Sequence, residues 1–281
     1  MIRIITDSAA DFELWELEKR NITCIPLVVM FGETEYRENV NLSKTEFYDL
    51  LAASKTLPKT AQASPQILLD LFEQAKDAGD EAIYICLSSA ISGTYQSAMM
   101  TRQLAGGEGL YVLDSLTATG GQRLLVEYVA KLRDEGKTAA EIMEAAEKLR
   151  GRISLYACMD TLENLYRGGR ISQTVYTLGT MAQIKPIIHL NEAGQVTVPA
   201  KAMGMKKGVE QLCKLVDKCP PDDRFPFYVM YTSKRSGGEA LADRFRAMGC
   251  DIPDDRIIQV GAAIGTHIGI NAIGFVYIAK E

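Results

Sequence analysis

The sequence predicts an α/β protein with two domains, and three observations support this fold class. Through the N-terminal half, short runs of β-branched residues alternate with amphipathic stretches, which is typical of βαβ units around a parallel sheet flanked by helices. In the second half, two strand patterns flank the turn sequence Asn191-Glu192-Ala193-Gly194, which favours antiparallel pairing and hence a mixed sheet. A chain of 281 residues usually forms two hydrophobic cores, and hence two domains, rather than one. We place the boundary near Gly151, with an N-terminal α/β domain over residues 1–151 and a C-terminal α/β domain over residues 152–281.

The N-terminal domain is expected to begin with strands and capped helices in alternation. Asp11 is predicted to cap a first helix, and Ser43 with Glu46 forms a capping box for a helix that runs through Ala53. The loop over residues 58–65 ends in Ser64-Pro65, a cap followed by proline at the first helical position. The expected strands are, in chain order, Ile2 to Thr6, the apolar run Ile22 to Phe31, Ala82 to Leu87, and Gly109 to Leu113.

Two consecutive helical patterns, Gly120 to Glu135 and Thr138 to Arg150, close this domain. In the C-terminal domain a helix is expected from Lys206 to Lys218, together with several strands. Those strands are Ile153 to Met159, Lys185 to Leu190, Gln195 to Ala200, Phe225 to Thr232, Ile257 to Val260, and Ile273 to Ala279.

Composition and motif searches argue against several classes of function. The net charge is −5 with neither sign collected into a block, which argues against a nucleic-acid partner. Neither GxxxxGK[ST] nor GxGxxG occurs between a strand and a helix, which argues against a nucleotide loop. With two histidines and no HExxH or clustered cysteine ligands, no metal and no cofactor are expected.

The six cysteines and the N-terminal sequence indicate the cellular compartment of the protein. No CxxC occurs, so reduced and buried thiols are expected rather than disulfides or zinc. At the N-terminus, an acidic residue follows the apolar stretch too early for a signal peptide. This pattern predicts a cytoplasmic protein. The stretch Val260 to Ala279 approaches membrane length, but polar residues and four glycines interrupt it. We therefore expect a loop and a buried strand there, and no transmembrane segment.

Small hydroxyl and carboxylate residues follow several of the expected strands. In open α/β sheets, ligands bind beyond the carboxyl ends of strands, so these residues are candidates for a site. Helix capping is the alternative for any single pair, since serine, threonine and aspartate also begin helices. The groups are Thr6-Asp7-Ser8, Ser88-Ser89, Asp114-Ser115 and Thr232-Ser233.

The richest loop runs from Leu87 to Tyr95, leaving a strand and entering a helix. A helix N-terminus presents unpaired N–H groups and a partial positive charge, and Gly93 lets a ligand come close. Ser92 and Thr94 add hydroxyl groups. This combination predicts a site for an anion such as a carboxylate or a phosphate.

Two glycine-rich segments carry further candidates. In Leu162 to Ser172, a short helix ends at a double glycine, and Arg170 follows it as a donor that the turn could direct at an anion. In Gly261 to Gly269, glycines recur every four residues around His267. The alternatives are an ordinary helix-to-helix corner for the first and a satisfied core histidine for the second.

Five separated motifs resemble those of the DegV family, in order and spacing over essentially the whole chain. The resemblance implies an α/β fold whose C-terminal domain encloses an apolar lipid tunnel, and a bound long-chain fatty acid as ligand. It implies a non-catalytic role as the fatty-acid-binding subunit of a bacterial fatty acid kinase. The motifs are Thr6-Asp7-Ser8, Thr60-x-Gln62-x-Ser64, Ser92-Gly93-Thr94-Tyr95, Gly168-Gly169-Arg170-Ile171-Ser172 and Gly265-Thr266-His267.

The resemblance also implies roles for individual residues. Thr60, Ser92 and the backbone of Gly93 match the family's carboxylate-binding positions, and Arg170 and His267 match those beside the head group. The last two would support phosphoryl transfer by a separate ATP-binding kinase subunit that resembles dihydroxyacetone kinase and makes acyl phosphate. The chain departs from the family's pattern at Ala61 and Ala63, where Ser and Pro are usual, and at Ile270-Asn271, where Pro-Gly is usual.

Two other functions stay open at this point. One is a lipid or ester hydrolase with Ser92 as nucleophile and His267 as base, although the sequence lacks GxSxG. The other is a lipid-binding regulatory module without a kinase partner. A transient contact with a membrane surface is compatible with any of these lipid-binding roles.

Overall fold

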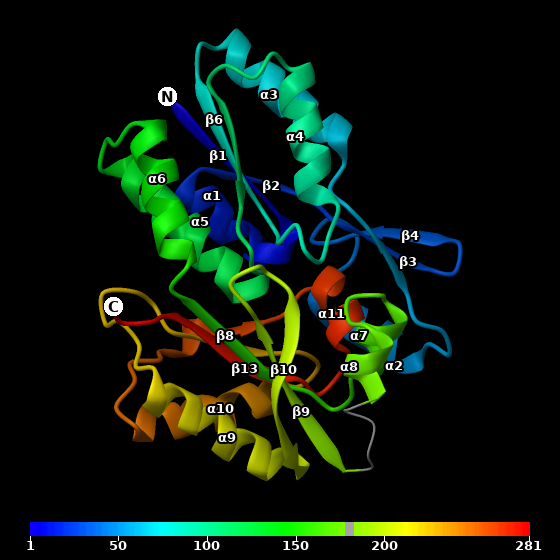
Figure 1. Cartoon of the computed structure of the whole chain (residues 1–281). Coiled ribbons are helices and arrows are strands. Elements are labelled where there is room, and N and C mark those ends of the chain that lie inside the picture. Colours follow the sequence, from blue (N-terminus) through cyan, green and yellow to red (C-terminus); the bar gives the residue numbers. More distant parts are fainter. Residues whose placement is uncertain (178–182) are drawn as a thin grey trace.

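The computed structural model describes residues 1–177 and 183–281. Figure 1 shows two main sheets, one formed by the early part of the chain above and one formed by the later part below, with α5 (Thr119–Asp134) between them. This helix contacts β1 (Ile2–Asp7) and β6 (Glu81–Cys86) of the first sheet, and it contacts β8 (Ile153–Cys158) and β13 (Ile273–Ile278) of the second. An α/β fold with two sheets is therefore confirmed. The boundary between residues 151 and 152 stays a proposal.

The first sheet has four strands in the order β2-β1-β6-β7, and all of its pairings are parallel, as the alternating pattern predicted. Its central strands, β1 and β6, are buried over most of their length because helices cover both faces. The strands are β1 (Ile2–Asp7), β2 (Ile22–Ile25), β6 (Glu81–Cys86) and β7 (Leu110–Asp114). The covering helices are α1 (Leu14–Arg20), α3 (Pro65–Asp77), α4 (Thr94–Leu104), α5 and α6 (Ala139–Arg150).

One predicted cap is wrong. Asp11 does not begin a helix. It ends the short 3-10 helix Ser8–Ala10 in a left-handed conformation, with φ of 58°. The cap of α1 is Glu13, whose capping box is completed by Glu16. The Asp11 carboxylate instead makes hydrogen bonds that are long-range in the sequence: it accepts from Gly261 N and from Thr119 Oγ1.

A small antiparallel sheet, in the order β4-β3-β5, lies beside the first. The apolar run Ile22 to Phe31 is split between β2 and this sheet, at Pro26, which has no N–H to donate. The expected loop at 58–65 contains the short strand β5, which pairs with β3. The elements are β3 (Val28–Phe31), β4 (Thr34–Arg37), β5 (Lys59–Ala61) and the nearby α2 (Lys44–Ala53), whose Ser43 and Glu46 form the predicted capping box.

The second main sheet has six strands in the order β10-β9-β8-β13-β11-β12. It is mixed, as predicted, because β11 and β12 are parallel while the other pairs are antiparallel. The helices α9 (Gly204–Lys218) and α10 (Arg235–Ala247) cover its outer face (Figure 1). The strands are β8 (Ile153–Cys158), β9 (Ile184–Leu190), β10 (Val196–Met203), β11 (Tyr228–Tyr231), β12 (Ile257–Gln259) and β13 (Ile273–Ile278), with a 3-10 turn at Asp254–Arg256 before β12.

Three short helices complete the described chain: α7 (Glu163–Arg167), α8 (Gln173–Thr177) and α11 (Ala262–Ile268). The first two form the helix-to-helix corner expected around the double glycine. The third replaces the loop expected after Val260. Its first N–H groups are accepted by the carboxylates of Asp11 and Glu38, which lie 250 and 224 residues away in the chain. The sequence around α11 does not indicate that such distant side chains cap this helix.

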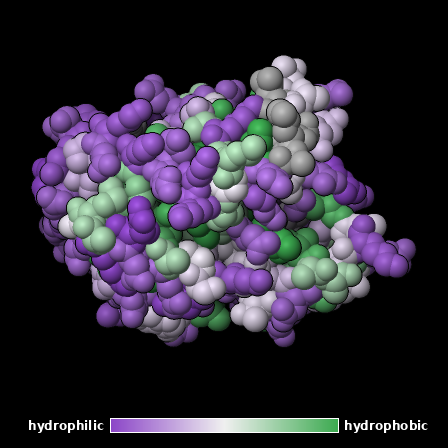
Figure 2. Space-filling view, turned by 90° about the horizontal axis from the view of Figure 1, so that it is seen from below, coloured by the Kyte–Doolittle hydropathy of each residue, from purple (hydrophilic) through white to green (hydrophobic). Residues whose placement is uncertain are grey.

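Polar residues dominate the surface, and the cysteines differ from the prediction in their burial. Seen from below, polar residues cover most of the surface and hydrophobic residues lie between them in small groups (Figure 2). All six cysteines are free, as expected, but only three of them are buried: Cys24 and Cys250 are partly exposed, and Cys219 is exposed. Among residues 1–177 and 183–281, no helix is both long and apolar enough to cross a membrane.

Candidate ligand-binding site

A cavity of about 280 Å³ lies between the end of the first sheet and the inner face of the second. Its wall is mainly apolar and comes from both halves of the chain. The tip of the β9–β10 hairpin helps to hold the two halves together there, because Gly194 O accepts a hydrogen bond from Ser88 Oγ at 3.0 Å. The apolar lining includes Leu27, Leu87, Ile91, Ala118, Leu155, Ala157, Leu165, Ile188, Leu190, Val196, Met230, Val260, Ala263, Ile264 and Ile268.

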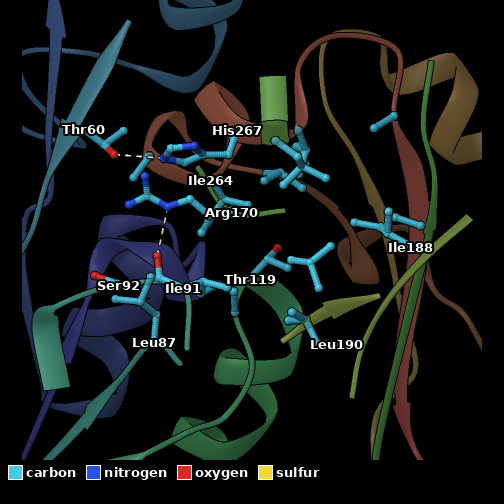
Figure 3. A pocket seen from close by; sticks show the side chains of 18 of the residues that line it. Thr60, Leu87, Ile91, Ser92, Thr119, Arg170, Ile188, Leu190, Ile264 and His267 are labelled. Atoms are coloured by element: carbon cyan, nitrogen blue, oxygen red, sulfur yellow. Dashed lines mark hydrogen bonds between the residues drawn. The ribbon is translucent and has the colours of Figure 1, made fainter. Parts of the chain in front are cut away.

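The five predicted site residues all lie along this one cavity, although they come from four separate segments. Figure 3 shows Thr60, Ser92, Arg170 and His267 gathered at one end, with Ile188 and Leu190 at the opposite side. The cavity thus has a polar end and an apolar remainder. This is the shape that suits an amphipathic ligand with one polar head.

Thr60 and His267 are in direct contact at the polar end. Thr60 Oγ1 and His267 Nε2 are 2.9 Å apart. Burial, and then the charge of Arg170, lower the pKa of His267 to about 4, so the ring is neutral at pH 7. Its Nδ1 atom is buried and has no hydrogen-bond partner among the described residues. The backbone of Gly168 packs against that atom, and a side chain at position 168 would collide with it.

Arg170 is a partly buried cation whose hydrogen bonds go to neutral groups. Its Nε donates to Ile91 O at 3.0 Å, and a second nitrogen donates to Gly168 O. Burial lowers the pKa of this guanidinium. Within the described part of the chain, no carboxylate lies within salt-bridge distance of it. A buried charge without a counter-charge is costly, so this position favours an anion that comes from outside the chain.

Ser92 and Gly93 lie where the β6–α4 loop enters α4. Ser92 Oγ is 2.9 Å from Thr94 Oγ1 and accepts a hydrogen bond from Thr94 N at 3.2 Å. Gly93 is the cap residue of this eleven-residue helix and lines the cavity. A Cβ at position 93 would lie 2.8 Å from Gln62 Oε1, so glycine permits the close approach of the loop to β5. The close approach at Gly93 is therefore to Gln62, and the predicted approach of a ligand to this glycine stays a prediction.

Helix α11 carries His267, and two buried acidic side chains accept hydrogen bonds from the backbone at the N-terminus of this helix. Asp11 accepts from Gly261 N at 2.8 Å, and Glu38 accepts from Ala262 N and from Ser8 Oγ. Burial raises the pKa of Asp11 to about 6. Burial, and then the nearby charge of Asp11, raise the pKa of Glu38 to about 7. Gly261 fits between the two carboxylates because it has no side chain.

Three further polar residues of the cavity wall, Gln62, Thr119 and Thr232, were not among the five predicted site residues, although the motifs and strand-end groups above contain Gln62 and Thr232. Gln62 follows Thr60 by two positions at the end of β5, and the two-residue period of an extended strand could have identified it. Thr119 lies at the start of α5 with φ of 49°, an unusual conformation for a β-branched residue. No local sequence pattern marks that position.

Comparison with known proteins decides the family. The family described as "Uncharacterised protein, DegV family" matches residues 1–280. The chain belongs to the DegV family. A DegV domain-containing protein of Caldanaerobacter subterraneus is 33% identical over 282 residues, covering 99% of each chain. One from Clostridium perfringens is 30% identical over 283 residues, covering 98% of this chain and 96% of the relative.

Solved DegV structures share the fold of this DegV-family chain throughout its length. A fatty-acid-binding DegV family protein of Thermus thermophilus has a TM-score of 0.91 and 28% identity, covering 99% of both chains. DegV of Bacillus subtilis, described as a fatty acid binding protein, has a TM-score of 0.85 and 28% identity, also covering 99% of both. The predicted resemblance and the predicted fold class are therefore confirmed.

Proposed function

We propose that this protein binds a long-chain fatty acid in the cavity between its sheets. The carboxylate is held at the polar end by Thr60, Ser92 and the backbone of Gly93, and the tail occupies the apolar remainder. The observation that carries the proposal is Arg170, a partly buried cation at this end with no acidic partner among the described residues. The fatty-acid-binding descriptions of the Thermus thermophilus and Bacillus subtilis structures support the same ligand class.

The tail and the head group contribute differently to binding. At about 0.8 kcal/mol per buried CH₂, a tail of about 16 carbons contributes roughly 11 kcal/mol before the costs of ordering and association. Hydrogen bonds to a charged group contribute about 1.5 to 3 kcal/mol each. Affinity therefore comes mainly from the tail, and the polar end fixes the position of the carboxylate.

The finer part of the proposal concerns phosphorylation. The carboxylate is presented to a separate ATP-binding kinase subunit, similar to dihydroxyacetone kinase, which converts it to acyl phosphate in the cytoplasm. Arg170 and His267 flank the carboxylate and stabilise the negative charge that develops during phosphoryl transfer. On this view the chain has no turnover of its own. The partial burial of Arg170 supports this role, since electrostatic stabilisation is stronger where water is excluded.

The hydrolase alternative is less well supported by the contacts. In a hydrolase of this kind, the base would receive a proton from the serine hydroxyl and a third group would orient the base. Here His267 Nε2 contacts Thr60, and Ser92 Oγ contacts Thr94. Among the described residues, His267 Nδ1 has no orienting acceptor. We therefore do not propose Ser92 as a nucleophile.

Titration of delipidated protein with a fatty acid and with its methyl ester tests the proposed ligand. The ester keeps the tail but removes the negative charge, so weaker binding of the ester is expected if the polar end holds a carboxylate. Equal binding would contradict the proposed role of that end. Incubation with ATP and a dihydroxyacetone-kinase-like partner then tests the kinase role, since a lipid-binding module without a kinase would yield no acyl phosphate.

A further inference from the structure

The strand-end motif Thr6-Asp7-Ser8 does not contribute to the cavity wall, although its place at the end of β1 made it a candidate for the site. None of the residues that line the cavity in the described part of the chain comes from this motif. All three of its side chains are buried. Because buried polar groups are costly unless they are hydrogen-bonded, their partners indicate what the motif does.

Asp7 holds the loop that carries Ser92 and Gly93. Its carboxylate accepts a hydrogen bond from Leu87 N at 3.1 Å, where that loop leaves β6. It also accepts from Gln122 Nε2 on α5 at 3.0 Å. The first of the two loops at the polar end is therefore tied to the end of β1.

Ser8 reaches a second segment of the polar end through Glu38. Ser8 Oγ accepts from Leu27 N at 2.9 Å and donates to Glu38 Oε2 at 2.7 Å. The other carboxylate oxygen, Glu38 Oε1, accepts from the N–H of Ala262, the first residue of α11. The same short helix carries His267. A single carboxylate thus bridges the end of β1 and the helix that carries the imidazole.

The surroundings of Glu38 leave little freedom for its side chain. It is buried, and a Cβ at Gly261 would collide with its Oε1 and lie 2.9 Å from Asp11 Oδ1. Among the described residues, no cation forms an ion pair with Glu38, since the amine of nearby Lys44 donates to Asp11 O and to Glu13. Its two hydrogen bonds therefore fix the position of this carboxylate.

The imidazole of His267 tolerates little displacement. Thr60 Oγ1 lies 2.9 Å from its Nε2 on one side (Figure 3), and the backbone of Gly168 packs against its Nδ1 on the other. Helix α11 has seven residues, which is about two turns, and its backbone hydrogen bonds make so short a helix move as one body. A shift at Ala262 would therefore reach the ring.

We propose that Glu38 is a positioning residue for His267: its carboxylate joins Ser8 to the first residue of α11 and thereby sets where the imidazole lies at the polar end. The property that matters at position 38 is the reach of the side chain, not its charge. The effect of this positioning on phosphorylation rests on the proposed function, whereas the placement of the ring is a property of the protein alone.

Two substitutions separate reach from charge. Glu38→Asp keeps the carboxylate but is shorter by one methylene, so it cannot bond to Ser8 and Ala262 together. Glu38→Gln keeps the length, since its Oε1 can accept from Ala262 N and its Nε2 can donate to Ser8 Oγ. We expect Glu38→Asp to displace the ring and Glu38→Gln to leave it in place.

The first measurement is an NMR titration of the imidazole resonances in ligand-free protein. The chain has two histidines, so the His189 resonances serve as an internal reference and should coincide in all variants. Burial keeps the pKa of His267 at about 4 in the wild type, and Glu38→Gln should retain this value. In Glu38→Asp the displaced ring gains water, so its pKa should rise towards the usual 6.5.

The second measurement is acyl phosphate formation with the kinase partner at saturating fatty acid. Glu38→Asp should lower the rate by roughly tenfold to a hundredfold, the cost of a misplaced group, and Glu38→Gln should restore it. Glu141→Asp is the matched control, because Glu141 accepts from Thr138 N and Thr138 Oγ1 in a capping box at the start of α6. It should match the wild type in both measurements.

A merely structural role for Glu38 would lower the melting temperature of Glu38→Asp but leave the pKa of His267 unchanged in the folded variant, and this result would overturn the inference. A rise of equal size in Glu38→Gln would also overturn it, because charge and not reach would then be responsible. If Glu38→Asp does not fold, Ser8→Ala takes its place, and an unchanged pKa of His267 there decides against the inference. A wild type that forms no acyl phosphate would instead count against the proposed function, while the NMR titration still tests the positioning.

Discussion

Thr60 Oγ1 and His267 Nε2 lie 2.9 Å apart, although 207 residues separate them in the chain. The contact joins β5 of the small antiparallel sheet to α11. The cap residue of that helix is Gly261, whose N–H donates a hydrogen bond to Asp11 at 2.8 Å. The polar end of the cavity is thus assembled from the early and the late parts of the chain, and its geometry depends on how α11 is held.

Replacing the proposed phosphoryl-transfer residues should separate binding from phosphorylation. Arg170→Ala and His267→Ala are expected to keep fatty-acid binding, because the tail supplies most of the affinity. Acyl phosphate formation with the kinase partner should fall by roughly a hundredfold or more, because charge stabilisation in the transition state is lost. Arg167→Ala is the control, since Arg167 is exposed and pairs with Glu163 on α7. Equal loss of both activities would show that the roles are wrongly assigned.

Removing the Ser92 hydroxyl should weaken the ligand's hold without emptying the cavity. Ser92→Ala is expected to reduce affinity by roughly tenfold to a hundredfold, the value of one hydrogen bond to a charged group. Calorimetric titration of delipidated protein measures this. Ser89→Ala, in the same loop but outside the cavity lining, should bind like the wild type. A complete loss of binding in Ser92→Ala would contradict the dominance of the tail.

Ligand binding should raise the pKa of His267. Without an anion, burial and then the charge of Arg170 lower this pKa to about 4. A carboxylate beside the ring favours the charged imidazolium, so the pKa should move upward when a fatty acid binds. NMR titration of the imidazole resonances with and without ligand checks the direction. A pKa that stays the same on saturation would mean that the carboxylate binds away from His267.

Glu38 should make folding stability fall as the pH rises. Burial, and then the charge of Asp11, raise its pKa from the usual 4.5 to about 7. Between these two values the folded protein keeps a proton that the unfolded chain has released, so the contribution of Glu38 to stability is present below pH 4.5 and is lost as the pH rises to about 7. Glu38→Gln cannot titrate and should lack this component.

Thermal melting of the wild type and of Glu38→Gln across that pH range measures the component as a difference. The melting temperature of the wild type should fall relative to the variant as the pH increases. Glu33→Gln, at an exposed position, serves as the control and should follow the wild type. A constant difference between wild type and Glu38→Gln would mean that Glu38 does not exchange its proton on unfolding in this range.

Local signals in the sequence predicted much of the fold, and long-range contacts account for the errors. The Ser43 and Glu46 capping box is visible because both partners lie within one helical turn. The prediction that Asp11 caps a helix is wrong because its partners, Gly261 and Thr119, are far away in the chain. The expected loop after Val260 is wrong for the same reason, since distant carboxylates cap α11 there.

The candidate site shows a similar division. The motifs around Thr60, Ser92, Arg170 and His267 could be identified in the sequence, and the structure brings them to one cavity, while their individual roles stay predictions. The wall residue Ala157 could not be identified, because its place depends on the pairing of β8 with β9 and β13. Such pairing follows from the sheet as a whole and not from any short stretch.

Native mass spectrometry of the protein as purified tests the central claim most directly. The account predicts that part of the protein carries one additional mass equal to that of a long-chain fatty acid, and that denaturation releases it. A bound nucleotide or metal in its place, or a protein that stays free of fatty acid even after incubation with excess ligand, would contradict the account.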